Sequence, residues 1–270
     1  SIRVIIGSSD AAMSSLGSGT VDSDQMTVMI GTSGAVRRLV GCPTMDPKQR
    51  TFCYYMGNQL WFAGGAINNG GIALRWFRDN FGERARAEAQ KTGASAYKIL
   101  CDYAQKVPAG SDGLLFLPFL AGERSPHWNS SIRGTLFGLS LHHTQAHVIR
   151  ALLEGICYRV YSVIQPLEEL IGTSAEIRVT GGFTRSPLWL QILSDVLGRE
   201  LMVAAEPEGS VLGAAAFAYH NLGMIDSFQY LLEKNPIVKK VGPVTNTHKF
   251  YQIQFNKYMH LYWKFEKEFA

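Results

Sequence analysis

The sequence predicts an α/β domain in which several antiparallel strands precede a regular alternation of strands and helices. Between residues 26 and 65, four short apolar runs are separated by glycine or polar turns, which is typical of antiparallel strands. From residue 176 onward, strand-like and helix-like segments alternate, as they do in sheets of parallel strands. The chain has 270 residues, 46% of them apolar and 18% charged, so it can bury a core as one large domain or two lobes.

The first half of the chain is predicted to be rich in strands. The run at 2–7 is expected to form a buried strand that leads directly into a glycine-spaced helix beginning at Asp10. The other strands are expected at 26–31, 35–40, 51–57, 59–65 and 113–120, and the helices at 70–81 and 95–107.

The second half is predicted to begin with a long helix. Apolar residues such as Val148 and Leu152 recur on one face of this helix. Thr144 can cap its N-terminus, and Pro166 is expected to kink or end it. Residues 246–270 are expected to form a helix docked on its own domain, since aromatic residues recur there at intervals of four and three. These aromatic residues are Tyr251, Phe255, Tyr258, Tyr262, Phe265 and Phe269. Between these helices, strands are expected at 176–182 and 200–204, and helices at 186–198 and 209–223.

Composition and charge exclude several classes of protein. The net charge is +4 and the basic residues are scattered, which argues against a nucleic-acid partner but allows a small anionic ligand. Four cysteines lie far apart, so we expect reduced thiols and a cytoplasmic location. No apolar run is long enough to predict a membrane span. The chain opens without an initiator methionine, so we expect it to be part of a longer protein.

Three glycine turns are candidates for binding phosphate groups. The GTSG turn at 31–34 joins two strands, and its backbone N–H groups and threonine hydroxyl could surround phosphate oxygens. Gly71 opens a helix, where free N–H groups attract anions. Gly181 and Gly182 end a strand before a helix that Ser186 can cap, an edge where α/β domains bind ligands. Each turn alone could equally be an ordinary connection. The sequence contains no Walker motif and no G-x-G-x-x-G, which argues against a P-loop enzyme or a nicotinamide-binding domain.

Asp10 is the single acidic residue between residues 5 and 19, and its neighbours are small. Its carboxylate could accept a proton from a substrate hydroxyl, and the small neighbours would leave room for that substrate. Alternatively, Asp10 could cap the helix that begins there by accepting hydrogen bonds from its first N–H groups. The two roles are compatible.

Other polar residues support weaker predictions. The histidines between 142 and 147 lack an acidic ligand at suitable spacing, so no metal site is predicted. Glu123 and Arg124 occupy a loop after a buried strand, where they could contact substrate or pair with each other. Asp46 is expected in a solvated turn.

Taken in order, several segments resemble the C-terminal half of the FGGY carbohydrate kinases, a family that includes glycerol kinase, xylulokinase and one class of gluconate kinase. The resemblance covers residues 4 to about 225, and LAGERSPHWNSSIRG is most similar to the gluconate kinases. It implies the actin-like, ribonuclease H-like ATPase fold, with 1–270 as the C-terminal nucleotide-binding lobe and the N-terminal sugar-binding lobe absent. The segments are GSSDAAMSSLGSG, IGTSG, NNGGIALRWFRD, FLPFLAGERSPHWN, RGTLFGLSLHHTQAHVIRALLEGICY, VTGGFTRSPLWLQILSDVLG and GSVLGAAAFA.

The resemblance also implies roles for particular residues. Asp10 matches the general base of the family, and Arg75 and Ser186 stand where glycerol kinase has Gln and Asn. The implied nucleotide and phosphate contacts are Gly31, Thr32, Ser33, Gly34, Gly71, Arg75, Gly181, Gly182 and Ser186. The predicted substrate contacts are Ala11, as a small neighbour of Asp10, and the loop residues Glu123 and Arg124.

The implied activity is ATP-dependent phosphorylation of a sugar or sugar-acid hydroxyl. D-gluconate to 6-phospho-D-gluconate is the closest match, and a xylulokinase-like substrate is an alternative. Mg²⁺ would bridge the phosphates and keep much of its water, so no metal ligand is assigned in this chain. This chain alone is expected to be almost inactive without the other lobe of the same protein, and a homodimer remains open. The rival prediction is a non-catalytic nucleotide-binding module of the same fold.

Overall fold

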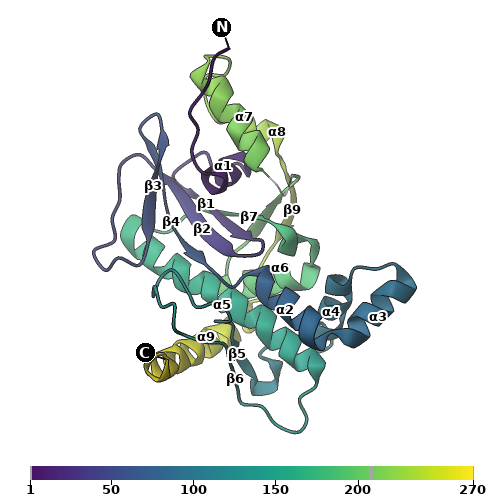
Figure 1. Ribbon diagram of the computed structural model, residues 1–270. Coiled ribbons are helices and arrows are strands. Elements are labelled where there is room, and N and C mark those ends of the chain that lie inside the picture. Colours follow the sequence, from purple (N-terminus) through teal and green to yellow (C-terminus); the bar gives the residue numbers. More distant parts are fainter. Residues whose placement is uncertain (1, 207–208, 270) are drawn as a thin grey trace.

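The computed structural model describes residues 2–206 and 209–269 and shows a mixed seven-stranded sheet between two groups of helices (Figure 1). The strand order is β3-β4-β2-β1-β7-β8-β9, and β5 and β6 form a separate two-stranded sheet. The strands are β1 (Gln25–Ile30), β2 (Gly34–Val40), β3 (Phe52–Gly57), β4 (Leu60–Ile67), β5 (Leu115–Leu117), β6 (Thr135–Phe137), β7 (Glu176–Thr180), β8 (Leu201–Ala204) and β9 (Ile237–Val241).

β1 joins the antiparallel and the parallel parts of the sheet. It pairs antiparallel with β2 and parallel with β7, and β7 in turn pairs parallel with β8. The carboxyl ends of β1, β7 and β8 therefore lie at the same edge of the sheet. The turns at Gly31 and Gly181 both begin at this edge, which is where sheets of this kind bind ligands.

The larger core lies on one face of the sheet. Side chains that alternate along β1, such as Met26 and Val28, belong to this core together with side chains of the long helix α5. Phe77 of α2 and Tyr258 of α9 belong to the same core. The helices that contribute to it are α2 (Gly71–Phe81), α3 (Glu83–Thr92), α4 (Ala96–Ala104), α5 (Gln145–Ile171), α6 (Pro187–Leu197) and α9 (Thr245–Phe265).

A smaller core lies on the opposite face, under α1 (Asp10–Gly17), α7 (Ser210–Asn221) and α8 (Tyr230–Lys234). Leu39 of β2 and Phe62 of β4 point into it. The backbones of α1 and α7 touch, because a Cβ added to Gly213 would lie 1.9 Å from the Met13 carbonyl oxygen. Helix α1 is therefore anchored directly on α7.

The segment at 2–7 is not a strand, contrary to the prediction. It runs without regular structure, and Ile2, Val4 and Ile6 are exposed. A strand needs a neighbour that accepts its hydrogen bonds, and both edges of β1 are already taken by β2 and β7. An apolar run alone does not provide such a neighbour.

Of the two outcomes predicted at Pro166, a kink or an end, the end is excluded: α5 continues through Pro166 to Ile171, because burial of its apolar face compensates for the hydrogen bond that proline cannot donate. Other predictions differ from the structure. The strand expected at 113–120 is limited to β5, and helix α3 was not predicted. Asp46 is buried rather than solvated, and hydrogen bonds from the Arg50 side chain are the main cause that lowers its pKa to about 2.

The C-terminal region forms α9, followed by one short 3-10 turn at Glu266–Glu268. Tyr251, Phe255, Tyr258 and Tyr262 are buried along one side of α9, as the aromatic spacing predicted. Residue 270, the last of the predicted terminal helix, lies outside the described residues. Among the helices that the structure describes, none is long and apolar enough to cross a membrane.

Candidate active site

The turn between β1 and β2 is held by the N-terminus of α2. The Gly71 N–H donates to the Gly31 carbonyl at 2.7 Å, and the Ile72 N–H donates to the Thr32 carbonyl at 3.0 Å. These two helix amides are therefore already used inside the protein. Gly71 does not offer its own N–H to a phosphate, so its predicted part in phosphate binding is indirect.

The bonds from α2 orient two other amides of the turn. Peptide groups are planar and trans, so the N–H of Thr32 points away from the Gly31 carbonyl, and the N–H of Ser33 points away from the Thr32 carbonyl. Within the described residues, neither amide donates a hydrogen bond. With the exposed Thr32 hydroxyl beside them, these two N–H groups form a cradle for an anion such as phosphate.

Glycine is required around this turn because other backbone segments lie very close. A Cβ on Gly70 would lie 2.6 Å from the Ser33 carbonyl oxygen, and one on Gly34 would lie 2.9 Å from Ile67 Cγ1. Gly34 thus lets the turn pack closely against β4, while Thr32 and Ser33 form the outer side of the turn.

The second glycine turn, after β7, contains two glycines with different roles. Gly181 has φ +101°, and a Cβ there would lie 2.5 Å from the Ile30 carbonyl oxygen, so Gly181 lets β7 approach the end of β1. Gly182 has no atom within 4 Å of the Cβ position. Ser186 caps α6 by accepting a hydrogen bond from the Trp189 N–H at 3.3 Å, with Pro187 as the first helical residue.

A cavity of about 490 Å³ and a second of about 650 Å³ lie next to these elements. The larger one, the nucleotide cavity, lies between the two glycine turns and α4, and its size suits a nucleotide. It has both apolar walls, such as Leu74 and Trp189, and polar ones, such as the ion pair of Lys98 and Asp102 at 2.7 Å. Six predicted residues line it, namely Gly31, Thr32, Gly71, Arg75, Gly182 and Ser186.

A leucine at position 182 is expected to weaken ATP binding at least about tenfold, because its side chain would fill part of the nucleotide cavity. The melting temperature should stay nearly unchanged, since nothing lies near the added Cβ. Calorimetric titration with ATP measures the effect, and Gly41→Leu, which also adds a side chain in open space, is the control. Equal ATP affinity in the two variants would place the nucleotide elsewhere.

Asp10 is the first residue of α1, and Ser9 rather than Asp10 is its cap. The Ser9 hydroxyl accepts a hydrogen bond from the Ala12 N–H at 3.2 Å, which corrects the expectation of an Asp10 cap. Asp10 Oδ1 accepts from the Ala11 N–H at 2.7 Å, and the carboxylate is exposed. The carboxylate thus remains accessible to a substrate at the positive end of the helix.

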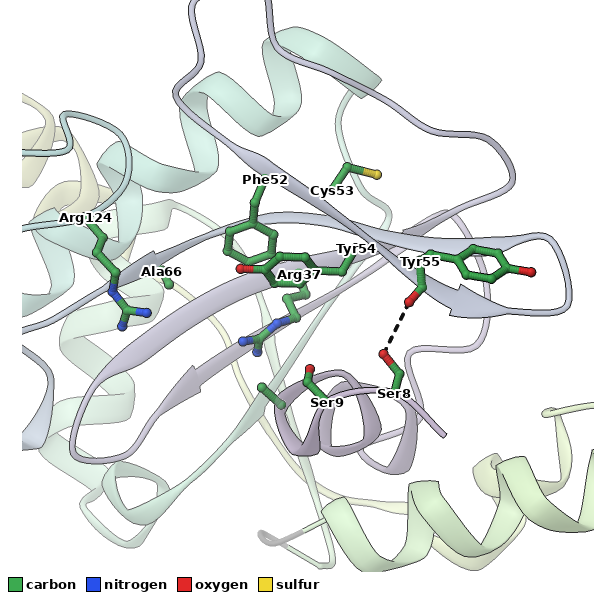
Figure 2. A pocket seen from close by; sticks show the side chains of 10 residues that line it. Ser8, Ser9, Arg37, Phe52, Cys53, Tyr54, Tyr55, Ala66 and Arg124 are labelled. Atoms are coloured by element: carbon green, nitrogen blue, oxygen red, sulfur yellow. Dashed lines mark hydrogen bonds between the residues drawn. The ribbon is translucent and has the colours of Figure 1, made fainter. Parts of the chain in front are cut away.

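The smaller cavity, here called the α1 cavity, is lined by Ser9 and Ala11 on either side of Asp10 in the chain and by residues of β2, β3 and β4 (Figure 2). Predicted substrate contacts Ala11 and Arg124 line it, together with Arg37, which was not predicted. The full lining is Ser8, Ser9, Ala11, Arg37, Phe52, Cys53, Tyr54, Tyr55, Ala66 and Arg124.

Arg37 projects from β2 on the same side as α1 (Figure 2). It is only 5% exposed, and its guanidinium makes no hydrogen bond to the described residues. Burial lowers its pKa to about 10, against the attraction of Tyr54 and Asp10, and the positive charge of Arg124 lowers it further. The sequence offered no signal that singles out Arg37, because Arg38 follows it directly in the same strand and only the structure shows which of the two faces the cavity.

Glu123 lies inside the protein and connects three segments. Its Oε1 accepts from the Asn68 N–H at 2.7 Å and from the Arg124 N–H at 2.8 Å, and its Oε2 accepts from Arg159 Nε at 3.2 Å. The side chains of Glu123 and Arg159 are both fully buried. Glu123 therefore pairs with Arg159 of α5 rather than with the Arg124 side chain, and it positions the loop from which Arg124 reaches the cavity.

The histidines near the start of α5 are used for capping. The Thr144 N–H donates to His147 Nδ1 at 3.1 Å, and His147 Nε2 lies 3.1 Å from Asp112 Oδ2. The described part of the chain contains no cluster of three or more His, Cys, Asp or Glu side chains that could hold a metal ion.

The mixed sheet, with glycine turns at the carboxyl ends of β1 and β7 beside a nucleotide-sized cavity, defines the class: an actin-like ATPase lobe of a sugar kinase. The family model "FGGY family of carbohydrate kinases, C-terminal domain" matches residues 26–222. The chain belongs to the FGGY family of carbohydrate kinases, as the resemblance in its sequence predicted.

Individual relatives agree with this assignment. Gluconokinase of Bacillus subtilis (strain 168) is 40% identical over 249 residues, which are 92% of this chain and 48% of the relative. Two structures from Lactobacillus acidophilus superpose with TM-scores of 0.85: a ligand-bound xylulose kinase at 31% identity and a gluconate kinase at 29%. Each match covers 96% of this chain and 51% of the other chain. The chain thus spans about half the length of the relatives it matches.

Proposed function

We propose that this chain is the nucleotide-binding half of a kinase that transfers the γ-phosphoryl group of ATP to a hydroxyl of a sugar acid. The observation that carries the proposal is the turn at Gly31–Gly34, which has free Thr32 and Ser33 amides and of which Gly31 and Thr32 line the nucleotide cavity. The names of the relatives, gluconokinase and gluconate kinase, favour D-gluconate as substrate and 6-phospho-D-gluconate as product. Such a reaction belongs in the cytoplasm, where ATP is available.

In this proposal each element has one chemical task. The Thr32 and Ser33 amides neutralise negative charge on the phosphates, and Gly182 leaves space for the nucleotide. Asp10 accepts the proton of the attacking hydroxyl as the new O–P bond forms and the bond to ADP breaks. An Mg²⁺ ion bound together with ATP would offset the negative charge of the phosphate groups. Closure of a second lobe would exclude water and so protect ATP from hydrolysis.

A phosphorylation screen of the two-lobe protein tests this proposal. Gluconate, xylulose, glycerol and ribulose are compared in a coupled assay of ADP formation, and gluconate should give the highest kcat/KM. This chain alone should show little turnover, because the other lobe would supply most contacts to the sugar. Robust turnover by the chain alone would contradict the need for that lobe.

The names of several relatives favour a second candidate, xylulose, since xylulose kinases match at about 30% identity. A preference for xylulose in the screen would assign the chain to that activity. Binding of ATP without phosphorylation of any of the four sugars would instead support a non-catalytic nucleotide-binding module.

A further inference from the structure

The α1 cavity contains an arginine, Arg37, whose guanidinium lies over the Phe52 ring, 5.8 Å from its centroid, but has no anionic partner in the described residues. Arg37 Nε and Nη1 are buried without a hydrogen bond, and the structure shows no carboxylate within ion-pair distance of this guanidinium. A buried cation without an anionic partner is unfavourable, so an anion that enters the cavity would be stabilised by Arg37. In contrast, the adjacent Arg38 points to the other side and donates to the carbonyls of Ser23 and Gly172.

A second cation faces the same cavity from another segment. Arg124 Nε is also buried without a partner, and Nη2 donates to the Ile67 carbonyl at 3.2 Å, which fixes the side chain. Its main chain is held by Glu123, so its position is set by the buried pair with Arg159. Figure 2 shows both guanidinium groups on the side of the sheet where Ser8 and Ser9 lie.

None of the ten residues that line this cavity is acidic. The nearest acid is Asp10, whose charge is felt at Arg37 but which makes no ion pair with it. The cavity is therefore positively charged, and hydroxyl groups of Ser9 and Tyr54 lie at its wall. A planar guanidinium binds an oxyanion through two parallel hydrogen bonds, which suits a carboxylate.

We propose that Arg37, together with Arg124, binds the carboxylate of the sugar-acid substrate and so selects sugar acids over neutral sugars. This inference rests on the proposed kinase function. In a linear sugar acid the carboxylate and the terminal hydroxyl are at opposite ends. Binding of the carboxylate at Arg37 would therefore orient the chain so that a hydroxyl, and not the acid group, meets Asp10.

The test compares Arg37→Met with the wild-type two-lobe protein. The KM for gluconate should rise about 10- to 100-fold, as expected for loss of a charge-assisted hydrogen-bonded contact, while the KM for ATP stays within about twofold. The KM for a neutral sugar such as xylulose should stay the same or fall. Arg37→Lys, which keeps the charge without the fork geometry, should be intermediate.

Two control variants show whether the change in KM is specific to Arg37. Arg86→Met, on the exposed surface of α3, should change none of these constants. Arg75→Met, in the nucleotide cavity, should raise the KM for ATP but not that for gluconate. Arg37→Met should fold, with a melting temperature no lower than wild type, because it removes an unpaired buried charge.

Gluconate binding without ATP, followed by calorimetry, provides a readout that does not depend on catalysis. Loss of this binding in Arg37→Met supports the proposal. A fall in kcat for all sugars with unchanged gluconate binding would overturn it and make Arg37 a positioning residue for Asp10. Competition of inorganic phosphate with gluconate at this site, lost in Arg37→Met, would also overturn it by identifying a phosphate site. If the wild-type protein phosphorylates no sugar, the proposed function fails instead.

Discussion

Replacing Asp10 with asparagine is expected to abolish sugar phosphorylation and to leave ATP binding intact. The amide keeps the shape of the side chain but cannot accept the proton of the attacking hydroxyl. A general base contributes about 10²- to 10⁴-fold to a rate, so kcat should fall by about that factor. The KM for ATP should change little, because Asp10 does not line the nucleotide cavity. A coupled assay of the two-lobe protein measures kcat, and calorimetry measures ATP affinity.

Asp226→Asn is the matched control, because Asp226 is an exposed acid that lines neither cavity. It should retain wild-type kinetics. Loss of folding is not expected in Asp10→Asn, since Ser9 caps α1 and the Asp10 carboxylate is exposed. A kcat within a few-fold of wild type would rule out Asp10 as the base.

Replacing Glu123 with alanine is expected to destabilise the domain by about 3 to 5 kcal/mol. The Arg159 guanidinium would lose its charged partner while remaining fully buried, and the Asn68 and Arg124 amides would lose their acceptor. Urea unfolding of the chain, followed by circular dichroism, measures the change. The exposed pair of Lys98 and Asp102 is the control, and Lys98→Ala should cost at most about 1 kcal/mol.

The double variant Glu123→Leu with Arg159→Met separates the charge effect from simple loss of packing. It should be more stable than Glu123→Ala, because it leaves no buried charge unpaired. If Glu123→Ala lowers the free energy of unfolding by less than about 1 kcal/mol, water or a rearrangement must supply hydrogen bonds to Arg159. Glu123 would then not be the residue that positions the loop of Arg124.

The parts of the fold predicted correctly from the sequence are those that depend on local patterns. The strands β1 to β4 and the α6 cap at Ser186 follow from alternation and capping residues that lie next to each other in the chain. The segment at 2–7 has the composition of a strand. Whether it forms one depends on pairing with a free sheet edge, which is formed by residues far away in the sequence and cannot be seen from the segment itself. The ordered glycine turns led to the family because their sequence order is itself a long-range signal.

The candidate site was predicted in part for the same reason. Residues in glycine turns, such as Thr32 and Gly182, could be identified because the turns end strands. Arg37 and Arg159 could not, because in sequence each is only one basic residue among many, and their meaning depends on burial and on the presence or absence of a partner. Gly71 shows the reverse case, since its position was predicted but its amide proved to be used by the turn itself.

The two hydrogen bonds from α2 to the turn have an electrical consequence. The Gly31 and Thr32 carbonyls accept hydrogen bonds from α2, and the same two peptide groups carry the outward-facing N–H groups of Thr32 and Ser33. The dipoles of these two peptide groups therefore align with those of α2, and each polarises the next. Each free amide thereby becomes a stronger donor than an isolated turn would offer. An anion on the turn would then interact with the field of the helix although it touches none of the helix's own N–H groups.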